Sequence, residues 1–172
     1  MLAIDGPAAG GKSTLAHDLA QFFPQAAVVS LDDFVTPLKT QRPADYEASR
    51  GPAHLRLGDC VEEVLQPLKR NAPAQYAALD WSTDQISVRR RVEPANLVIF
   101  EGVYAGCRRL RPYVDAMIWM GDPEPNQLSK IIARDGPSLI AHWCGIWLPT
   151  EAQYFAKETP WDIADLRLEV DG

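Results

Sequence analysis

A glycine-rich run near the start of the chain carries its clearest chemical signal. Positions 6–13 read Gly-Pro-Ala-Ala-Gly-Gly-Lys-Ser, which matches the spacing Gly-x-x-x-x-Gly-Lys-Ser. Because glycine has no Cβ, such a loop wraps closely and turns its amide N–H groups inward, which suits a phosphate ligand. The ammonium of Lys12 adds a positive charge for the outer phosphates, and the hydroxyl of Ser13 is a ligand for Mg²⁺. The predicted phosphate-binding residues are Gly6, Ala8, Ala9, Gly10, Gly11, Lys12, Ser13 and Thr14.

Two acidic side chains are placed to act beside this loop. Asp32 follows the mostly apolar run 26–31, and Glu101 follows the apolar run 97–100. Mg²⁺ takes hard oxygen ligands and keeps several waters, so Ser13, Asp32 and Glu101 are the expected magnesium ligands. Phosphoryl transfer from ATP also needs a carboxylate that takes the proton of the acceptor hydroxyl. Asp32 is the candidate and Asp33 the alternative, although such a pair can also cap a turn or a helix, and Glu101 can instead bind a backbone N–H.

Arg134 is the candidate for offsetting charge on the transferred phosphoryl group. It ends a predicted helix, with Lys130 one turn earlier. Arginines play this part in phosphoryl transfer, so the predicted catalytic residues are Lys12, Asp32 and Arg134. A cation at a helix C-terminus is also simply stabilising. The remaining basic clusters, 89–91 and 108–111, are interpreted as solvated surface, and the two tryptophans at 143 and 147 as core packing.

The apolar pattern predicts an α/β fold. Strands are expected at 2–4, 26–31, 97–100, 116–120 and 166–170, and helices at 15–23, 61–68, 128–135 and 139–147, the last ended by Pro149. Continuous apolar strands that alternate with helices indicate a parallel sheet covered on both faces. Ligands of such sheets bind at the carboxyl ends of the strands, where Gly6, Asp32 and Glu101 are expected to meet.

Length and composition suit one globular domain. We expect a single domain over 1–172, with polar insertions at about 35–57 and 71–94 and a lid region at about 130–150; the second insertion reads as a hairpin or a lid. Seventeen basic and 23 acidic residues give a formal charge of −6 without a broad basic stripe, so no nucleic-acid partner is expected. No apolar run approaches the roughly 18 residues of a membrane span, so no membrane partner is expected either.

No signal peptide is visible, and the three cysteines lack Cys-x-x-Cys spacing, which favours a reducing, cytoplasmic setting. The three histidines show no spacing typical of metal ligands. A monomer or a homodimer is expected.

Together the motifs resemble the uridine kinase family of P-loop kinases, which also includes nicotinamide riboside kinases and more distant phosphoribulokinase and pantothenate kinase relatives. The resemblance spans most of the chain, and its most specific parts are the Asp-Asp-Phe and Phe-Glu-Gly elements. The segments that carry it are Ile4-Asp5-Gly6 through Ser13-Thr14, Ser30-Leu31-Asp32-Asp33-Phe34, Ile99-Phe100-Glu101-Gly102-Val103 and Ala133-Arg134-Asp135.

The resemblance implies a three-layer P-loop NTPase fold, with a five-stranded parallel sheet in the order 2-3-1-4-5, helices on both faces and a small lid. It implies ATP- and Mg-dependent phosphorylation of a hydroxyl on a small molecule. Asp32 matches the family's proton acceptor and magnesium partner, and Glu101 matches its second acidic residue near the metal.

The acceptor is less well defined by the pattern. The expected acceptor-binding residues are Asp33, Phe34, Tyr76, Asp80, Trp81 and Arg89, of which Tyr76, Asp80 and Trp81 fall where members of the family that the chain resembles place such residues. The family's arginine-rich lid is replaced here by Gly136-Pro137-Ser138-Leu139, and its Tyr-Asp-Phe…His-x-Arg acceptor pattern is missing. The acceptor is therefore expected to be a nucleoside-like compound or another small metabolite. A nucleoside monophosphate kinase, which would use the arginines at 89–91, and a nucleotide-dependent regulatory module remain alternatives.

Overall fold

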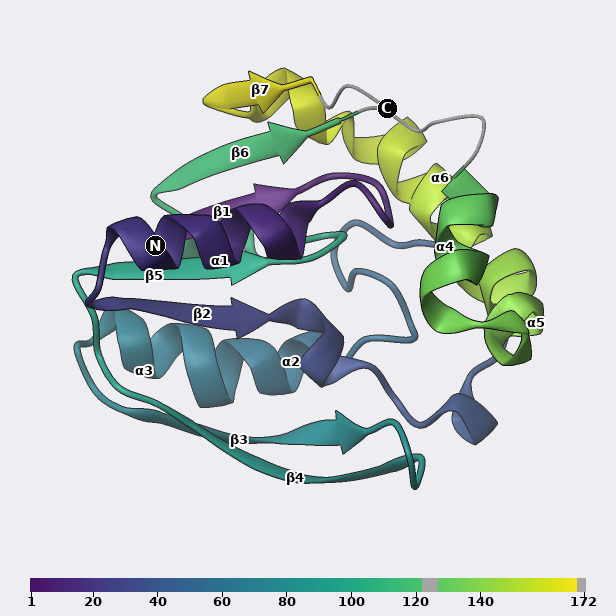
Figure 1. Cartoon of the computed structure of the whole chain (residues 1–172), viewed down its shortest axis with the longest axis horizontal. Coiled ribbons are helices and arrows are strands. Elements are labelled where there is room, and N and C mark those ends of the chain that lie inside the picture. The colour runs from purple at the N-terminus through teal and green to yellow at the C-terminus, as the bar shows by residue number, and fades with distance from the viewer. Residues whose placement is uncertain (122–126, 170–172) are drawn as a thin grey trace.

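A five-stranded parallel sheet forms the centre of the computed structural model, of which residues 1–121 and 127–169 are described here (Figure 1). Its order is β2-β5-β1-β6-β7. When only these strands are numbered along the chain, the order becomes 2-3-1-4-5, which confirms the order that the family resemblance implied. Their bounds are Leu2–Asp5 for β1, Ala26–Ser30 for β2, Leu97–Glu101 for β5, Ala116–Met120 for β6 and Leu166–Leu168 for β7. The predicted last strand reached Val170, which lies outside the described residues.

The central strand explains why these strands are apolar throughout. β1 pairs with β5 on one side and with β6 on the other, with Ile4 opposite Glu101 and Ile118. The successive residues Ala3 and Ile4 of β1 point to opposite faces of the sheet, and both are fully buried. A strand buried on both faces must be apolar at successive positions. Helices therefore have to cover the sheet on each side.

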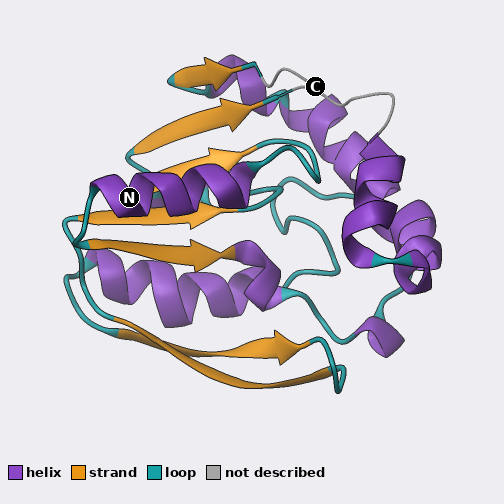
Figure 2. Cartoon of the chain, viewed as in Figure 1, coloured by secondary structure: helices purple, strands orange, loops and turns teal. Residues whose placement is uncertain are grey.

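One face is covered by α1 (Lys12–Phe22), whose Ala16 packs against Ile4 and Ile99. The other face carries the larger core, in which Ala3 and Phe100 meet side chains of the two longer helical stretches. The first stretch runs through α2 (Leu57–Asp59), a π-helical segment (Cys60–Leu65) and α3 (Gln66–Lys69). The second stretch ends in α6 (Leu148–Glu158). Figure 2 shows the resulting layers of helix, sheet and helix.

Three helical segments gather at the carboxyl ends of the strands (Figure 1). They are α4 (Gln127–Asp135), α5 (Ile140–His142) with the π-helical segment Trp143–Trp147, and α6. Pro149 was predicted to end a helix here, and this prediction is wrong, because the helix continues to Glu158. Proline is tolerated because it lies in the first turn of α6, directly after the π-helical segment, where its missing N–H costs little.

The segment 71–94, predicted as a hairpin or a lid, contains the antiparallel hairpin of β3 (Ala74–Asp80) and β4 (Gln85–Val92). Tyr76 and Ala78 face the core from β3. The segment 35–57 is mainly loop, with one short 3₁₀ helix at Leu38–Thr40 and two isolated bridges, Val35 with Leu55 and Glu47 with Gly51. Within the described ranges, no helix is both long enough and apolar enough to cross a bilayer. The remaining 3₁₀ helices are Leu31–Phe34, Arg111–Tyr113, Pro137–Leu139 and Pro160–Ile163.

Candidate active site

The glycine-rich run forms a tight loop between β1 and α1. Gly6 has a φ of +151°, and a Cβ there would lie 2.3 Å from the carbonyl oxygen of Met120 on the neighbouring strand. Gly11 has a φ of +83° and stands directly before α1. Between them, the N–H of Gly10 donates to the carbonyl of Pro7 at 3.1 Å. The loop therefore needs glycine at both ends, and it opens onto the N-terminus of α1, where backbone dipoles favour an anion.

Lys12 and Ser13 project from the first turn of α1. The Nζ of Lys12 donates to the carbonyl of Pro7 at 2.7 Å, across the loop, and the side chain is buried. Burial lowers the pKa of Lys12, while the charges of Asp5, Glu151, Asp32 and Glu101 oppose that shift. The hydroxyl of Ser13 donates to Glu101 at 3.1 Å.

Asp32 and Glu101 come from neighbouring strands. Ser30, the last residue of β2, pairs with Glu101 at the end of β5, so the turn after β2 brings Asp32 beside Glu101. Desolvation raises the pKa of Asp32, and the charge of Glu101 raises it further, while Lys12 and Arg134 act in the opposite direction. Asp32 remains open to a pocket. Two carboxylates, a hydroxyl and two cations thus share one edge of the sheet.

This donor set fits a magnesium ion. Among the residues that the structure describes, no three His, Cys, Asp or Glu side chains gather into a metal cage. Mg²⁺ does not need such a cage, because it binds through one or two carboxylates and fills its other positions with water and substrate phosphates. Ser13, Glu101 and Asp32 are the residues that would hold it.

A pocket of about 480 Å³ opens beside Asp32. The ring planes of Trp143 and Trp81 stand at 86° and 88° to that of Trp147, with ring centroids 4.7 and 6.3 Å from it. Burial lowers the pKa of His54 to about 4, so its ring is neutral near pH 7. Trp143 and Trp147, interpreted as core residues from their spacing, thus line a cavity. The pocket is lined by Asp32, Val35, His54, Leu55, Trp81, Val103, Tyr104, Arg134, Asp135, Leu139, Trp143, Trp147 and Glu151.

Of the expected acceptor-binding residues, the structure brings only Trp81 to this lining. Asp33 accepts a hydrogen bond from the hydroxyl of Tyr76 at 2.7 Å and lies 3.7 Å from Arg90. Phe34 is buried and stacks on Tyr76 with ring centroids 5.0 Å apart. Asp33, Phe34 and Tyr76 thus stabilise the turn that carries Asp32, and none of the three lines the pocket.

Asp80 and Arg89 lie elsewhere on the hairpin. The carboxylate of Asp80 accepts the N–H of Ser82 at 2.9 Å and so closes the hairpin turn. Arg89 is exposed on β4, opposite Ala77. Neither side chain lines the pocket, because their positions on β3 and β4 serve the turn and the outer surface.

Arg134 lines the pocket but is already paired. Its guanidinium donates to both carboxylate oxygens of Asp135, at 2.6 and 2.9 Å, and lies 5.9 Å from the ring centroid of Trp143. The bond to Asp135 is the main reason why the pKa of Arg134 is raised. The positive charge of Arg134 still acts to lower the pKa of Asp32.

Sequence reasoning missed Glu151, a buried acid on α6. It accepts the N–H of Ala8 in the phosphate loop at 3.1 Å and a bond from Gln127 at 2.8 Å. Burial raises its pKa, and these two bonds oppose that shift. The residue was overlooked because the helix was predicted to end at Pro149, two residues earlier.

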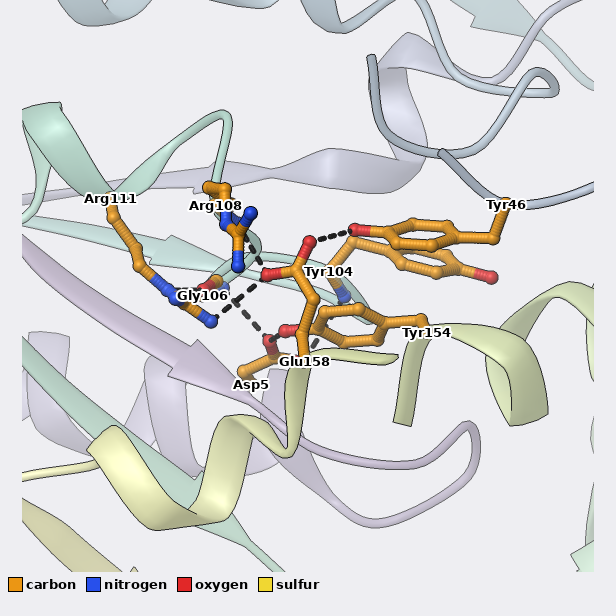
Figure 3. Close-up of polar contacts among 8 residues, drawn as sticks. All are labelled: Asp5, Tyr46, Tyr104, Gly106, Arg108, Arg111, Tyr154 and Glu158. Carbon is orange, nitrogen blue, oxygen red and sulfur yellow. Dashed lines mark hydrogen bonds and ion pairs between the residues drawn. The ribbon is translucent and has the colours of Figure 1, made fainter. Parts of the chain in front are cut away.

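A buried polar network fixes α6 against the base of the loop (Figure 3). Asp5, the last residue of β1, accepts the hydroxyl of Tyr154 at 2.6 Å and the N–H of Gly6 at 2.7 Å. On α6, one helical turn after Tyr154, Glu158 accepts hydrogen bonds from the hydroxyl of Tyr46 at 2.7 Å and from the guanidinium of Arg111 at 2.9 Å. Because every carboxylate oxygen in this network is partnered, α6 is anchored on both sides.

No known protein-family profile matches the chain. The uridine kinase of Borreliella burgdorferi is 23% identical over 142 residues, which cover 78% of this chain and 66% of that protein. A protein of Arabidopsis thaliana named inorganic pyrophosphatase TTM2 is 26% identical over 143 residues, which cover 78% of this chain but 20% of that protein. The chain thus spans between a fifth and about two thirds of the length of these relatives.

Solved structures extend the likeness to the fold. The structure of a possible uridine kinase from Bacillus stearothermophilus superposes with a TM-score of 0.74 at 22% identity, covering 98% of this chain and 87% of that one. Likeness at this identity establishes the architecture and leaves the substrate open. In sequence and in fold, the chain is similar to the uridine kinase-like P-loop kinases, as its motifs indicated.

Proposed function

We propose that the chain is a kinase that uses Mg-ATP to phosphorylate a hydroxyl group of a small metabolite. The observation that carries this proposal is the convergence of Ser13, Glu101 and Asp32 at the carboxyl edge of the sheet, where the hydroxyl of Ser13 lies 3.1 Å from Glu101 and Asp32 also lines an aromatic pocket. Phosphoryl transfer demands little covalent chemistry from a protein and much positioning and charge neutralisation. A phosphate loop, a magnesium donor set and an open carboxylate beside a pocket meet that demand.

Each residue then has a part in the transfer. The amides of the loop and Lys12 hold the phosphates, and Ser13, Glu101 and Asp32 are the residues that would hold the metal ion. The acceptor oxygen attacks the γ-phosphorus while the bond to the β–γ bridging oxygen breaks, and the acceptor proton passes to Asp32. Arg134 offsets negative charge on the transferred group. Bound Mg²⁺ supplies further charge neutralisation at the phosphates.

The pocket favours an uncharged, nucleoside-like acceptor over a nucleoside monophosphate. Among its described lining residues, Arg134 is the single arginine or lysine, and its guanidinium is paired with Asp135. The triplet 89–91, the expected source of charge for a phosphorylated acceptor, lies on the hairpin, where Arg90 faces Asp33 and Arg91 pairs with Glu93. Flat aromatic walls suit a planar ring.

The three free cysteines, two of them buried, suit the cytoplasmic setting that we also propose.

An acceptor screen tests the proposal. Mg-ATP is offered with nucleosides, sugars, vitamin precursors and nucleoside monophosphates, and ADP and the phosphorylated product are measured. We expect ADP to form only when an unphosphorylated acceptor is present, and Lys12→Ala to abolish it. ADP release that never depends on an acceptor would favour the regulatory module, and release of phosphate from pyrophosphate would favour the activity for which the Arabidopsis relative is named.

A further inference from the structure

Glu151 lies where the phosphate loop meets the pocket. Its side chain is 4% exposed, and its two carboxylate oxygens have different partners. One oxygen accepts the N–H of Ala8 at 3.1 Å, and the other accepts the Nε2 of Gln127 at 2.8 Å. The same side chain forms part of the pocket lining. It therefore faces the donor side and the acceptor side at once, although the proposed transfer steps give it no part.

Gln127 completes a bracket around one residue of the loop, Ala8. Besides Glu151, its Nε2 reaches the carbonyl of Ala8 at 3.2 Å. Ala8 is thus held at its N–H from α6 and at its C=O from the first residue of α4. These two helices also carry or border the pocket residues Arg134 and Trp147.

The bracket has a rigid support. One turn after Glu151, the hydroxyl of Tyr154 donates to Asp5 (Figure 3). Asp5 also accepts the N–H of Gly6 at the start of the loop. α6 is thus bound both to the base of the loop, through Tyr154, and to the loop itself, through Glu151. A shift of the loop at Ala8 must therefore displace Glu151 or break its bond.

We propose that Glu151 is a positioning residue that couples the two halves of the site. It holds Ala8 in the conformation that receives a nucleotide. It also transmits the structural change on nucleotide binding to the tryptophans that line the acceptor pocket, Trp81, Trp143 and Trp147. This inference rests on the proposed use of the loop as a nucleotide site. It goes beyond that function because it assigns the coupling to a residue outside the motif.

The probe for this coupling is Mg-ADP, whose phosphates occupy the loop without a γ-phosphate that could extend towards the pocket. Binding is measured by calorimetry, and the tryptophan fluorescence is recorded in the same titration. In the wild type, Mg-ADP should change the fluorescence, and Trp143→Phe should remove most of that change. In Glu151→Ala, the affinity should fall by at least about fivefold and the fluorescence response should be lost.

Two variants make the readout specific. Glu151→Gln keeps an amide oxygen that can accept the N–H of Ala8, so it should restore part of the affinity and of the response. Thr150→Val is the matched control: Thr150 is equally buried on α6, but its hydroxyl donates only to Ile146 at 2.6 Å within the helix. It should behave as the wild type in both measurements.

Several outcomes would overturn the inference. One is wild-type affinity and a full response in Glu151→Ala, and another is a response that survives in Trp143→Phe. If circular dichroism shows that Glu151→Ala does not fold, Gln127→Ala removes the other arm of the bracket and must show the same two losses. If the wild type binds no Mg-ADP at all, the nucleotide site itself fails, and the proposed function falls together with the coupling.

Discussion

Asp32 and Asp33 are adjacent in sequence, yet their surroundings differ. Asp33 accepts a hydrogen bond from the hydroxyl of Tyr76 at 2.7 Å and forms an ion pair with Arg90 at 3.7 Å. Asp32 faces the pocket and interacts through its charge with Glu101 and the cations of the site. A carboxylate that takes a proton from a substrate must be within reach of that substrate, so the open member of the pair is the candidate base.

Asp32→Asn should abolish turnover and leave nucleotide binding largely intact. The amide has nearly the same shape but cannot take the acceptor proton, and loss of such a group costs about 100- to 10,000-fold in rate. Acceptor-dependent ADP formation and Mg-ADP affinity are the two measurements. Asp33→Asn is the matched control and should lose much less activity. Unchanged turnover in Asp32→Asn would remove Asp32 from the mechanism.

His54 should make the stability of the protein depend on pH. Burial lowers its pKa from 6.5 to about 4 in the folded state. Between these values the unfolded chain binds more protons than the folded one, so the free energy of unfolding must fall as the pH falls. From pH 7 to pH 5 the loss from this single group should be about 2 kcal/mol.

Urea unfolding at the two pH values measures this loss. His54→Phe keeps an aromatic ring but has no proton to bind, so it should lose about 2 kcal/mol less than the wild type over the same interval. His17→Ala removes an exposed histidine and should keep the wild-type decline. An identical decline in His54→Phe would show that His54 is not the responsible group.

At the scale of elements, the acceptor pocket is built by segments that depart from regular structure. The π-helical segment Trp143–Trp147 brings two indoles four residues apart to the same cavity, with their planes at 86°. Wide helical turns of this kind occur often at functional sites. The hairpin of β3 and β4 contributes Trp81 from its turn. Because each wall comes from a different element, the pocket can be altered on one side without disturbing the sheet.

Trp81→Ala should weaken acceptor binding without unfolding the protein. Trp81 is 47% exposed, so little core packing is lost, but one aromatic wall of the pocket disappears. Stacking of a planar ring on an aromatic side chain contributes about 1–3 kcal/mol, so the KM for the acceptor should rise by about 5- to 150-fold. The nucleotide KM and the melting temperature should stay near the wild-type values.

Ile86→Ala is the control on the same hairpin. Ile86 is also exposed but does not line the pocket, so its removal should leave the acceptor KM unchanged. If both variants raised the KM equally, the hairpin would act through its overall stability. If Trp81→Ala had no effect, the acceptor would lie away from this wall.

At the scale of the whole molecule, the sequence predicted the sheet and the residues at its carboxyl edge. The loop lies between an apolar strand and a helix that adjoin it in sequence, so local spacing was enough to place Lys12 and Ser13. Parallel pairing then predicts that Glu101 comes close to them, and the 3.1 Å contact with Ser13 agrees with that prediction. Local pattern and a general rule of parallel sheets accounted for this part.

The remainder of the site depends on tertiary contacts that spacing does not reveal. Glu151 reaches Ala8 across 143 positions of the chain. It follows Pro149, which ordinarily signals the end of a helix, so the pattern predicted no helix there. Asp80 and Arg89 were expected near the acceptor from their place in the sequence. The pairing of β3 with β4 instead directs them to the turn and to the outer surface.

The polar network beneath the loop shows how the sheet and α6 are held together, and it can be tested through stability. Tyr154 is fully buried, and its hydroxyl donates to Asp5 at 2.6 Å. Desolvation raises the pKa of Asp5, and the bond from Tyr154 is the first of the contacts that oppose this shift. Removal of that donor leaves a buried carboxyl group with one hydrogen-bond partner fewer, which costs the desolvation of that group.

Tyr154→Phe should therefore lower the free energy of unfolding by about 1.5–3 kcal/mol, the contribution of a hydrogen bond to a charged group. Thermal unfolding should show a melting temperature lower by roughly 3–12 °C for a chain of this size. Tyr113→Phe is the matched control, because that hydroxyl has only a long contact of 3.4 Å with Gln66 and its loss should cost less than about 0.5 kcal/mol. Equal stability of the two variants would mean that Asp5 is satisfied by backbone amides alone, and α6 would then be held to the sheet by apolar packing.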